Sequence, residues 1–328
     1  MEAKTASHTT SGFRPGPRSR ASNAVAVKAV GRPRPKGGGA VPFAALFWRL
    51  PWLRSLLLLT PPLAWFVVIY FASLVLLLVT AFWTTDPFTT QVVQVWNTSN
   101  FERILNEPVY HDIVGRTVLL AVLVTLTDAA LAFPFAYYMA RVASRRVQTL
   151  LFAAVLLPLW ASYLARVYAW ILILNHSGLL NWSLQSIGLP PANIGYTNVA
   201  MWVVFSYIWL PFMIIPTYAA LERVPESLLE ASADLGARRW RTIRDIVLPL
   251  ALPGVVAGSI FTFSLTLGDY ITPVLVGGAG STFIGNVVFS NIGIANNIPF
   301  AAALSTIPVA IMAVYLFIAQ RLGAFEAL

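Results

Sequence analysis

Three ionisable residues lie inside long apolar stretches and are the side chains best placed to act on a solute. Asp128, Arg166 and Asp269 each interrupt a block of aliphatic and aromatic residues. A charge at the centre of a membrane helix costs roughly 2.5–3.5 kcal/mol on insertion scales, so each needs a partner, water or a functional purpose. We expect Asp128 near the bilayer midplane, counting about 1.5 Å per residue. The two carboxylates, with Tyr270 and Arg166 beside them, are candidates for a water-accessible pathway that favours a cationic solute.

A purely structural role for the same charges is the alternative. Arg166 and Asp269 both fall in the outer part of their apolar stretches and could form an ion pair. Asp128 has no cation at its depth in this chain, so it could instead be neutral or capped by a hydroxyl such as Thr125 or Thr127.

Other kinds of chemistry find little support in the sequence. The chain has no cysteine, which excludes disulfides, thiolate metal sites and cysteine nucleophiles. His8, His111 and His176 form no metal-binding spacing, and no G-x-x-x-x-G-K-[ST] phosphate loop is present. We therefore expect no catalytic residue, no metal and no cofactor, and a transport subunit that lacks its own ATPase motif rather than an enzyme.

The elements that position the charged residues are predicted to be membrane helices. The chain is 58% hydrophobic and 11% charged, against roughly 25% charged in soluble domains. A helix needs about 20 apolar residues to cross a bilayer, and six blocks are long enough. The sequence therefore predicts an all-α membrane protein with six transmembrane helices, at about residues 56–83, 117–140, 148–174, 199–220, 250–276 and 299–320.

Basic residues predict the orientation of these helices. Ten of the 22 Lys and Arg residues precede residue 56, and nine more fall in segments on the same predicted side of the membrane. Because cytoplasmic segments carry the excess of Lys and Arg, both termini are predicted to be cytoplasmic. Residues 1–50 are rich in Gly, Pro and Ser and predict a disordered basic tail, not a nucleic-acid-binding surface. Residues 51–328 would form the transmembrane domain.

The longest predicted cytoplasmic loop, residues 221–249, reads as two short helices joined at a glycine. Pro225 and Glu226 suit the start of the first helix, and Gly236 suits the left-handed position that closes it.

The second helix of the loop is expected at residues 237–248. Trp240, Ile243 and Val247 would share one face of it, and Pro249 would end the helix or kink it into the fifth span.

The spacing of this loop resembles the hallmark of permease subunits of binding-protein-dependent ABC importers, Glu-Ala-Ala, three residues, Gly, nine residues, then Ile-x-Leu-Pro. Here Glu230-Ala231-Ser232 is followed by Gly236 and by Ile246-Val247-Leu248-Pro249. Ser232 replaces the second alanine, a change between small residues that should still pack.

This resemblance implies the type I importer permease fold and a role for the loop in docking onto a separate ATPase. The residues it assigns to ATPase coupling are Glu230, Ala231, Ser232, Gly236, Leu248 and Pro249. It also implies a second permease subunit, an extracytoplasmic solute-binding protein, and a multi-pass location in the bacterial inner membrane. A secondary transporter or channel without an ATPase is the alternative function, but it leaves the loop spacing unexplained.

Within that family the chain resembles the spermidine/putrescine-type permeases. The resemblance rests on residues 267–278 (Leu-Gly-Asp-Tyr-Ile-Thr-Pro-Val-Leu-Val-Gly-Gly), on Ile284-Gly285-Asn286, on residues 166–170 (Arg-Val-Tyr-Ala-Trp) and on residues 178–181 (Gly-Leu-Leu-Asn). It covers the chain from about residue 56 onward and implies a polyamine-like solute, without fixing which one.

Overall fold

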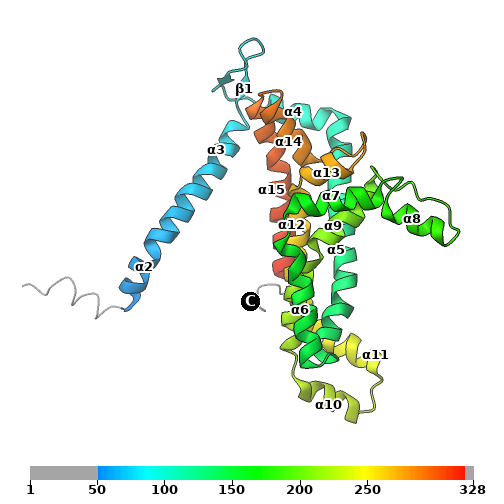
Figure 1. The fold of residues 1–328 in the computed structure, drawn as a ribbon. Helices are drawn as coiled ribbons and strands as arrows, with labels where there is room; N and C mark the ends of the chain where they lie inside the picture. Colours follow the sequence, from blue (N-terminus) through cyan, green and yellow to red (C-terminus); the bar gives the residue numbers. More distant parts are fainter. Residues whose placement is uncertain (1–50, 322–328) are drawn as a thin grey trace, which may run out of the picture. The chain divides into compact units, whose positions relative to one another are not determined.

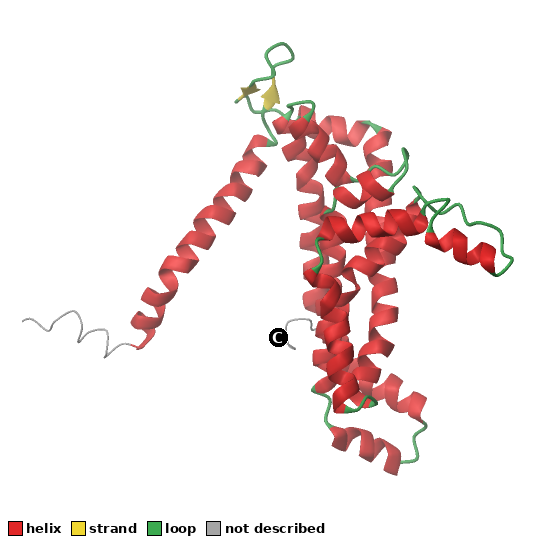
Figure 2. Cartoon of the chain, viewed as in Figure 1, coloured by secondary structure: helices red, strands yellow, loops and turns green. Residues whose placement is uncertain are grey.

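The computed structural model describes residues 51–321 of the 328-residue chain, so the predicted tail, residues 1–50, lies outside the described part. Described residues up to Leu63 belong to one unit and those from Ala64 onward to a second, and each is described by itself. The described chain is helical almost throughout, with a small antiparallel hairpin that pairs Thr84 with Val93 and Thr85 with Val92 (Figure 2). The predicted all-α class is confirmed.

The elements in chain order are α2 (Pro51–Phe66), π-helical turn η1 (Val67–Phe71), α3 (Ala72–Thr80), β1 (Thr84–Thr85), β2 (Val92–Val93), α4 (Ser99–Asn106), α5 (Pro108–Arg141), α6 (Arg145–Trp160), α7 (Tyr163–Leu174), α8 (Leu179–Ser186), α9 (Asn198–Glu222), α10 (Glu226–Asp234), α11 (Arg239–Thr242), π-helical turn η2 (Ile243–Val247), α12 (Leu248–Gly268), α13 (Ile271–Val276), α14 (Ile284–Gly293) and α15 (Ile298–Arg321).

Five helices in the described part are long and apolar enough to cross a membrane. A helix suits this solvent because it pairs its own backbone N–H and C=O groups, which lipid cannot do. A bent pair made from α6 with α7 and α8 gives a sixth span if it is counted as one crossing. The five helices are Leu58–Thr80, Pro108–Arg141, Asn198–Glu222, Arg239–Gly268 and Ile298–Arg321.

The predicted third span, residues 148–174, is not one straight helix. The chain bends by 96° between Arg145–Trp160 and Tyr163–Ser186. Ala161 and Ser162 leave helical geometry, with ψ of 144° and 139°, three and four residues after Pro158. Hydrophobicity alone predicted the length of this block but carried no signal for the bend.

The fifth predicted span, residues 250–276, is also interrupted. α12 ends at Gly268, and Asp269 takes extended backbone angles before the short helix α13 begins. At the other end of the same helix, Pro249 does not end the helix, which was one of its two expected effects. Helix runs without a break from Arg239 to Gly268, and the π-helical turn η2 lies just before Pro249, where proline removes a backbone donor.

Three helices, α5, α9 and α12, form the centre of the second unit and run side by side (Figure 1). α5 and α9 are parallel, because Leu120 and Val204 share one buried cluster and Ala136 and Leu221 share another further along both helices. α12 approaches α9 closely at Gly254, where an added Cβ would lie 2.4 Å from the Cβ of Ala220. The ends of these helices place α10 and α11 at one end of the bundle and α4, α13 and α14 at the other (Figure 1).

Candidate functional site

The first part of the loop between α9 and α12 has the form that its sequence predicts, whereas the second predicted helix, residues 237–248, begins at Arg239 and continues into α12. Pro225 precedes α10, and Glu226 lies in its first turn, where a carboxylate favours the positive end of the helix. Gly236 closes the helix with φ of +73°. The amide of Ala237 donates to the carbonyl of Ser232 (3.1 Å), and the amide of Gly236 donates to that of Ala233 (2.8 Å). This pair of bonds is the Schellman motif, which needs a left-handed residue where Gly236 stands.

The motif residues on α10 and at its end divide into two that face outward and two that build the loop. Glu230 and Ala231 are exposed on α10. Ser232 is buried, and its hydroxyl lies 2.8 Å from that of Thr242 on α11, so it ties the two arms of the loop together. Sequence reasoning treated this serine only as a small residue, although a hydroxyl in place of the alanine was a signal for a hydrogen bond.

Large apolar side chains on the loop face outward, which the sequence did not predict. Leu235 is 87% exposed and Trp240 is 70% exposed, and Leu228 is exposed as well. Of the residues expected to share one face of the second helix, Trp240 is exposed, whereas Val247 is fully buried. Leu248 and Pro249, at the start of α12, are also exposed. The loop therefore presents an apolar surface beside Glu230.

Asp128 lies in the middle of α5 and is 0% exposed. Neither of its carboxylate oxygens has a hydrogen-bond partner among the described residues. The two hydroxyls expected to cap it are engaged elsewhere. Thr125 donates to the carbonyl of Ala121 in its own helix (2.7 Å), and Thr127 accepts from the indole N–H of Trp202 (3.0 Å).

Two more buried polar groups without partners belong to α9. Ser206 lies close to Asp128, but neither the Ser206 hydroxyl nor the indole N–H of Trp209 has a hydrogen-bond partner in the described part of the chain. Buried polar groups are nearly always paired, so such a group calls for an explanation. Asp128 on α5 and Ser206 on α9 are thus two unpaired polar side chains that lie close together.

Asp269 is surrounded by donors. Its carboxylate accepts from the amides of Ile271 (2.7 Å) and Thr272 (3.2 Å), from the hydroxyl of Thr272 (3.0 Å), and from the hydroxyl of Tyr163 on α7. It caps the first turn of α13 and fastens that turn to α7. Tyr270 stacks on Phe289 of α14, with ring centroids 4.7 Å apart.

The alternative ion pair between Arg166 and Asp269 is not present, since the ion pairs in the described part of the chain join other residues. The Nε and Nη1 atoms of Arg166 are buried without hydrogen-bond partners there. Arg166 lines a cavity of about 300 Å³. The other residues that line it come from α7, the bend before it and α9: Ala161, Ala165, Ala169, Trp170, Ile173 and Tyr207.

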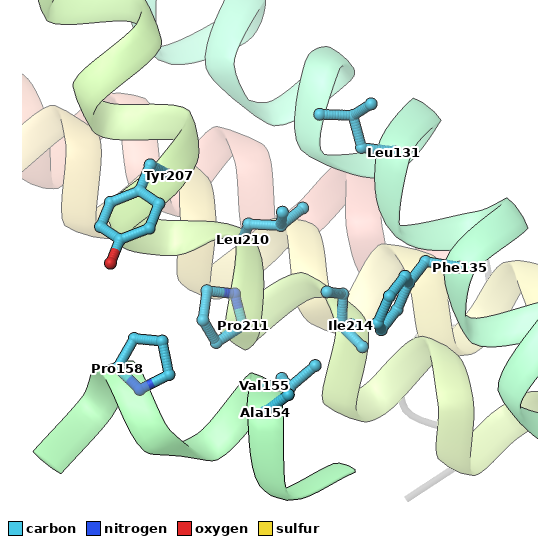
Figure 3. Close-up of a pocket in the computed structure, with 9 residues that line it drawn as sticks. All are labelled: Leu131, Phe135, Ala154, Val155, Pro158, Tyr207, Leu210, Pro211 and Ile214. Carbon is cyan, nitrogen blue, oxygen red and sulfur yellow. The ribbon is translucent and has the colours of Figure 1, made fainter. Parts of the chain in front are cut away.

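A second cavity of about 370 Å³ lies between α5, α6 and α9 (Figure 3). Its walls are almost wholly apolar, and the hydroxyl of Tyr207 is the one side-chain oxygen among the residues drawn (Figure 3). It has no carboxylate to attract a cation, and Asp128 lines neither of these cavities. The lining residues are Leu131, Phe135, Ala154, Val155, Pro158, Tyr207, Leu210, Pro211 and Ile214.

Residues 51–321 contain no candidate metal site. No group of three or more His, Asp or Glu side chains is placed there to hold a metal ion.

Comparison with known proteins identifies the family. Residues 132–325 match the family described as binding-protein-dependent transport system inner membrane component. The chain is 47% identical over 317 residues to the inner membrane ABC transporter permease protein YdcU of Escherichia coli (strain K12), covering 93% of this chain and 100% of that protein. It is 33% identical over 262 residues to the spermidine/putrescine transport system permease protein PotB of Salmonella typhimurium (strain SL1344), covering 78% of this chain and 89% of that protein.

Solved structures share the fold at low sequence identity. A chain of a bacterial alginate ABC transporter, in complex with an alginate pentasaccharide-bound periplasmic protein, aligns with a TM-score of 0.69 at 19% identity, over 86% of this chain and 96% of that one. A chain of the MetNI methionine ABC transporter in an inward-facing conformation aligns with a TM-score of 0.50 at 20% identity, over 68% and 99%. With the sequence matches, these observations show that the chain belongs to the binding-protein-dependent transport system inner membrane component family and is a multi-pass inner-membrane permease subunit of an ABC importer.

Proposed function

We propose that this subunit imports a small cationic solute of the polyamine class, driven by ATP hydrolysis on a separate subunit. The observation that carries the ATP-driven step is the loop, in which Gly236 closes α10 in a left-handed conformation and leaves Glu230 and Ala231 exposed. The solute class rests on the relative named as a spermidine/putrescine permease, since the name of the more similar relative states no solute.

The subunit works, in this proposal, as one of two permeases beside an ATPase and a solute-binding protein. The bent pair of helices counts as one crossing, which gives six spans and places both termini in the cytoplasm. The bias of Lys and Arg residues supports this orientation. It also places α10 and α11 on the side where ATP is available.

The loop docks through α10. Glu230 and Ala231 would enter a groove on the ATPase, with the exposed Leu235 and Trp240 adding apolar contact area. A short amphipathic helix in a groove is a common mode of protein recognition. Ser232 and Gly236 hold the shape of the loop, and Leu248 and Pro249 connect it to α12.

A carboxylate near the pathway would give the preference for cations, and we assign this role to Asp128. Its two oxygens lack partners in the described chain, and a cationic solute would supply them when α5 and α9 separate during transport. Because Asp128 is completely buried in this conformation, a solute would reach it only in another conformation of the transport cycle. Asp269 has its full set of donors, which supports structural capping rather than solute contact, and Tyr270 and Arg166 stay beside the pathway.

Solute-stimulated ATP hydrolysis tests the solute class. The complex of this subunit with its ATPase and second permease would be reconstituted in liposomes with the binding protein. We expect spermidine or putrescine to stimulate hydrolysis, and the neutral polyol sorbitol and the anion glutamate to leave it at the basal rate. Stimulation by sorbitol or glutamate without stimulation by an amine would contradict the proposal.

The substitution Gly236→Val tests the loop. A β-branched residue at φ of +73° is strained by about 1–2 kcal/mol, and open space around Gly236 excludes a steric clash as the cause. We expect loss of uptake with normal membrane insertion. Gly293→Val is the matched control, because Gly293 also faces open space but has no left-handed backbone. Normal uptake by Gly236→Val would count against the docking role.

A further inference from the structure

Arg141, the last residue of α5, hydrogen-bonds to the backbone where α9 ends and the loop that carries α10 begins. Nη2 of Arg141 donates to the carbonyl of Leu221, at 2.6 Å, and also to the carbonyl of Val224. Leu221 lies in the last turn of α9, whereas Val224 lies beyond the end of that helix and directly before Pro225 and α10. One guanidinium therefore spans the junction between the membrane helix and the loop.

The position is electrostatically favourable. The last carbonyls of a helix have no partner within it, and the C-terminal end carries partial negative charge. α5 and α9 are parallel, so their negative ends meet at the side chain of Arg141. Both bonds come from one nitrogen, Nη2. An arginine suits this partly buried place better than a lysine, because its side chain is longer and its head group is more weakly hydrated than an ammonium.

The junction is also packed, so that a displacement of α10 reaches α5 through contacts. Leu221, Val247 and Ala251 form one buried cluster with Ala136 of α5, and Leu229 of α10 packs against it. The bond between Ser232 and Thr242, described above, holds the second arm of the loop to the first. α10 is thus joined to α5 by polar and apolar contacts together.

We propose that Arg141 is a positioning residue that transmits movement of α10 to α5. The inference rests on the proposed docking role of the loop and adds the route by which docking reaches the membrane helices. A simple cap of α9 would need only the carbonyl of Leu221, whereas the second bond goes to Val224 at the base of the loop. Asp128 lies thirteen residues before Arg141 on the same unbroken helix, a rise of about 20 Å.

The test compares solute transported per ATP hydrolysed in the reconstituted complex. Arg141→Lys keeps the charge and Arg141→Gln keeps a donor, but both donor nitrogens stand closer to the backbone than Nη2, so we expect neither side chain to reach both carbonyls. We expect this ratio to fall roughly two- to thirtyfold in both variants, the range typical of changes along a coupling network, while ATP hydrolysis continues and the ATPase still copurifies. Arg146→Lys is the matched control, since Arg146 is exposed in the first turn of α6, and its ratio should equal that of the unmodified protein.

Two outcomes would overturn the proposal. A ratio in Arg141→Lys and Arg141→Gln equal to that of Arg146→Lys would show that the bonds transmit nothing. Loss of both Arg141 variants from the membrane would make Arg141 a residue needed for folding alone. Gly236→Val, measured in parallel, separates this inference from the docking role. If Gly236→Val and the Arg141 variants all transport normally, the docking role of the loop is rejected as well. If Gly236→Val is defective and the Arg141 variants are normal, only the role of Arg141 is rejected.

Discussion

The carboxylates of Asp269 and Asp128 both interrupt apolar stretches of the sequence, but their surroundings differ. Asp269 stands where the chain leaves α12, so the free amides of Ile271 and Thr272 and the hydroxyl of Tyr163 can reach it. Asp128 stands in the middle of α5, where every neighbouring amide is already bonded within the helix, and it has no partner in the described chain. The backbone satisfies a carboxylate at a break in a helix, whereas only another side chain, water or a ligand can satisfy one within it.

This contrast implies that stability and solute preference are separable between the two sites. Removing Asp269 should leave several donors unpaired, whereas removing the charge of Asp128 should leave no described donor unpaired. Leaving a buried group unpaired costs roughly 1–3 kcal/mol, and removing an uncompensated buried charge costs little or stabilises. Variants at the two positions can therefore break or sharpen the comparison.

The largest effect is expected from Asp269→Ala. The substitution removes the cap of α13 and the link to α7, and we expect the free energy of unfolding to fall by about 2–4 kcal/mol. Thermal unfolding of the purified subunit and its abundance in the membrane are the measurements. Asp112→Ala is the control, because Asp112 is exposed on α5. Equal stability of the two variants would remove the distinction between the carboxylates.

A smaller effect is expected from Tyr163→Phe. The ring and its stacking on Trp209 stay, while the hydroxyl that bonds to Asp269 is lost. We expect a loss of about 1 kcal/mol in the same unfolding measurement. Tyr168→Phe, at an exposed position of α7, should change nothing. A Tyr163→Phe protein as stable as the Tyr168→Phe control would mean that the turn after α12 does not depend on α7.

The double variants sharpen the contrast further. Asp269→Asn and Tyr163→Phe touch the same hydrogen bond, so we expect their effects on the free energy of unfolding to depart from additivity by at least about 0.5 kcal/mol. Asp128→Asn and Tyr163→Phe share no hydrogen bond and should add within about 0.5 kcal/mol. The reverse pattern of coupling would show that Asp128, and not Asp269, belongs to the network around Tyr163.

The smallest effect on stability is expected from Asp128→Asn. The replacement keeps the shape of the side chain and removes a charge that has no partner, so the free energy of unfolding should change by less than about 1 kcal/mol. Uptake of the cationic solute should nevertheless weaken. Ser206→Ala, on the facing helix, tests whether the neighbouring hydroxyl contributes. Normal uptake by Asp128→Asn at normal abundance would leave the solute class resting on the relatives alone.

The parts of the loop that could be predicted from the sequence are those that depend on the backbone preference of a single residue. The left-handed conformation of Gly236, which closes α10, followed from residue type and spacing, because few residue types other than glycine adopt that conformation readily. The outward position of Trp240 did not follow, since an apolar residue on a helix is normally assigned to a core. It lies instead on the surface through which we propose that the loop meets another protein, which the sequence of a single chain does not display.

The fold shows the same division. The lengths of the apolar blocks predicted α9 and α15 to within two residues, because the thickness of the bilayer sets the length of a straight helix. The bend at residues 161–162 and the break at Asp269 did not follow from the lengths of the apolar blocks, since each depends on where a few backbone groups find partners. Average hydrophobicity does not report on those partners.

The π-helical turn η2, between α11 and α12, sets the direction in which the side chains of α11 point. A π turn holds one residue more than the α-helical turn it replaces, and each residue of an α-helix turns the chain by about 100° about its axis. The side chains from Arg239 to Thr242 therefore point about 100° away from where an uninterrupted α-helix would aim them. A deletion of one residue within Ile243–Val247 would keep the helix continuous and the composition of the loop almost unchanged, yet it would swing this basic turn a quarter of the way around the helix.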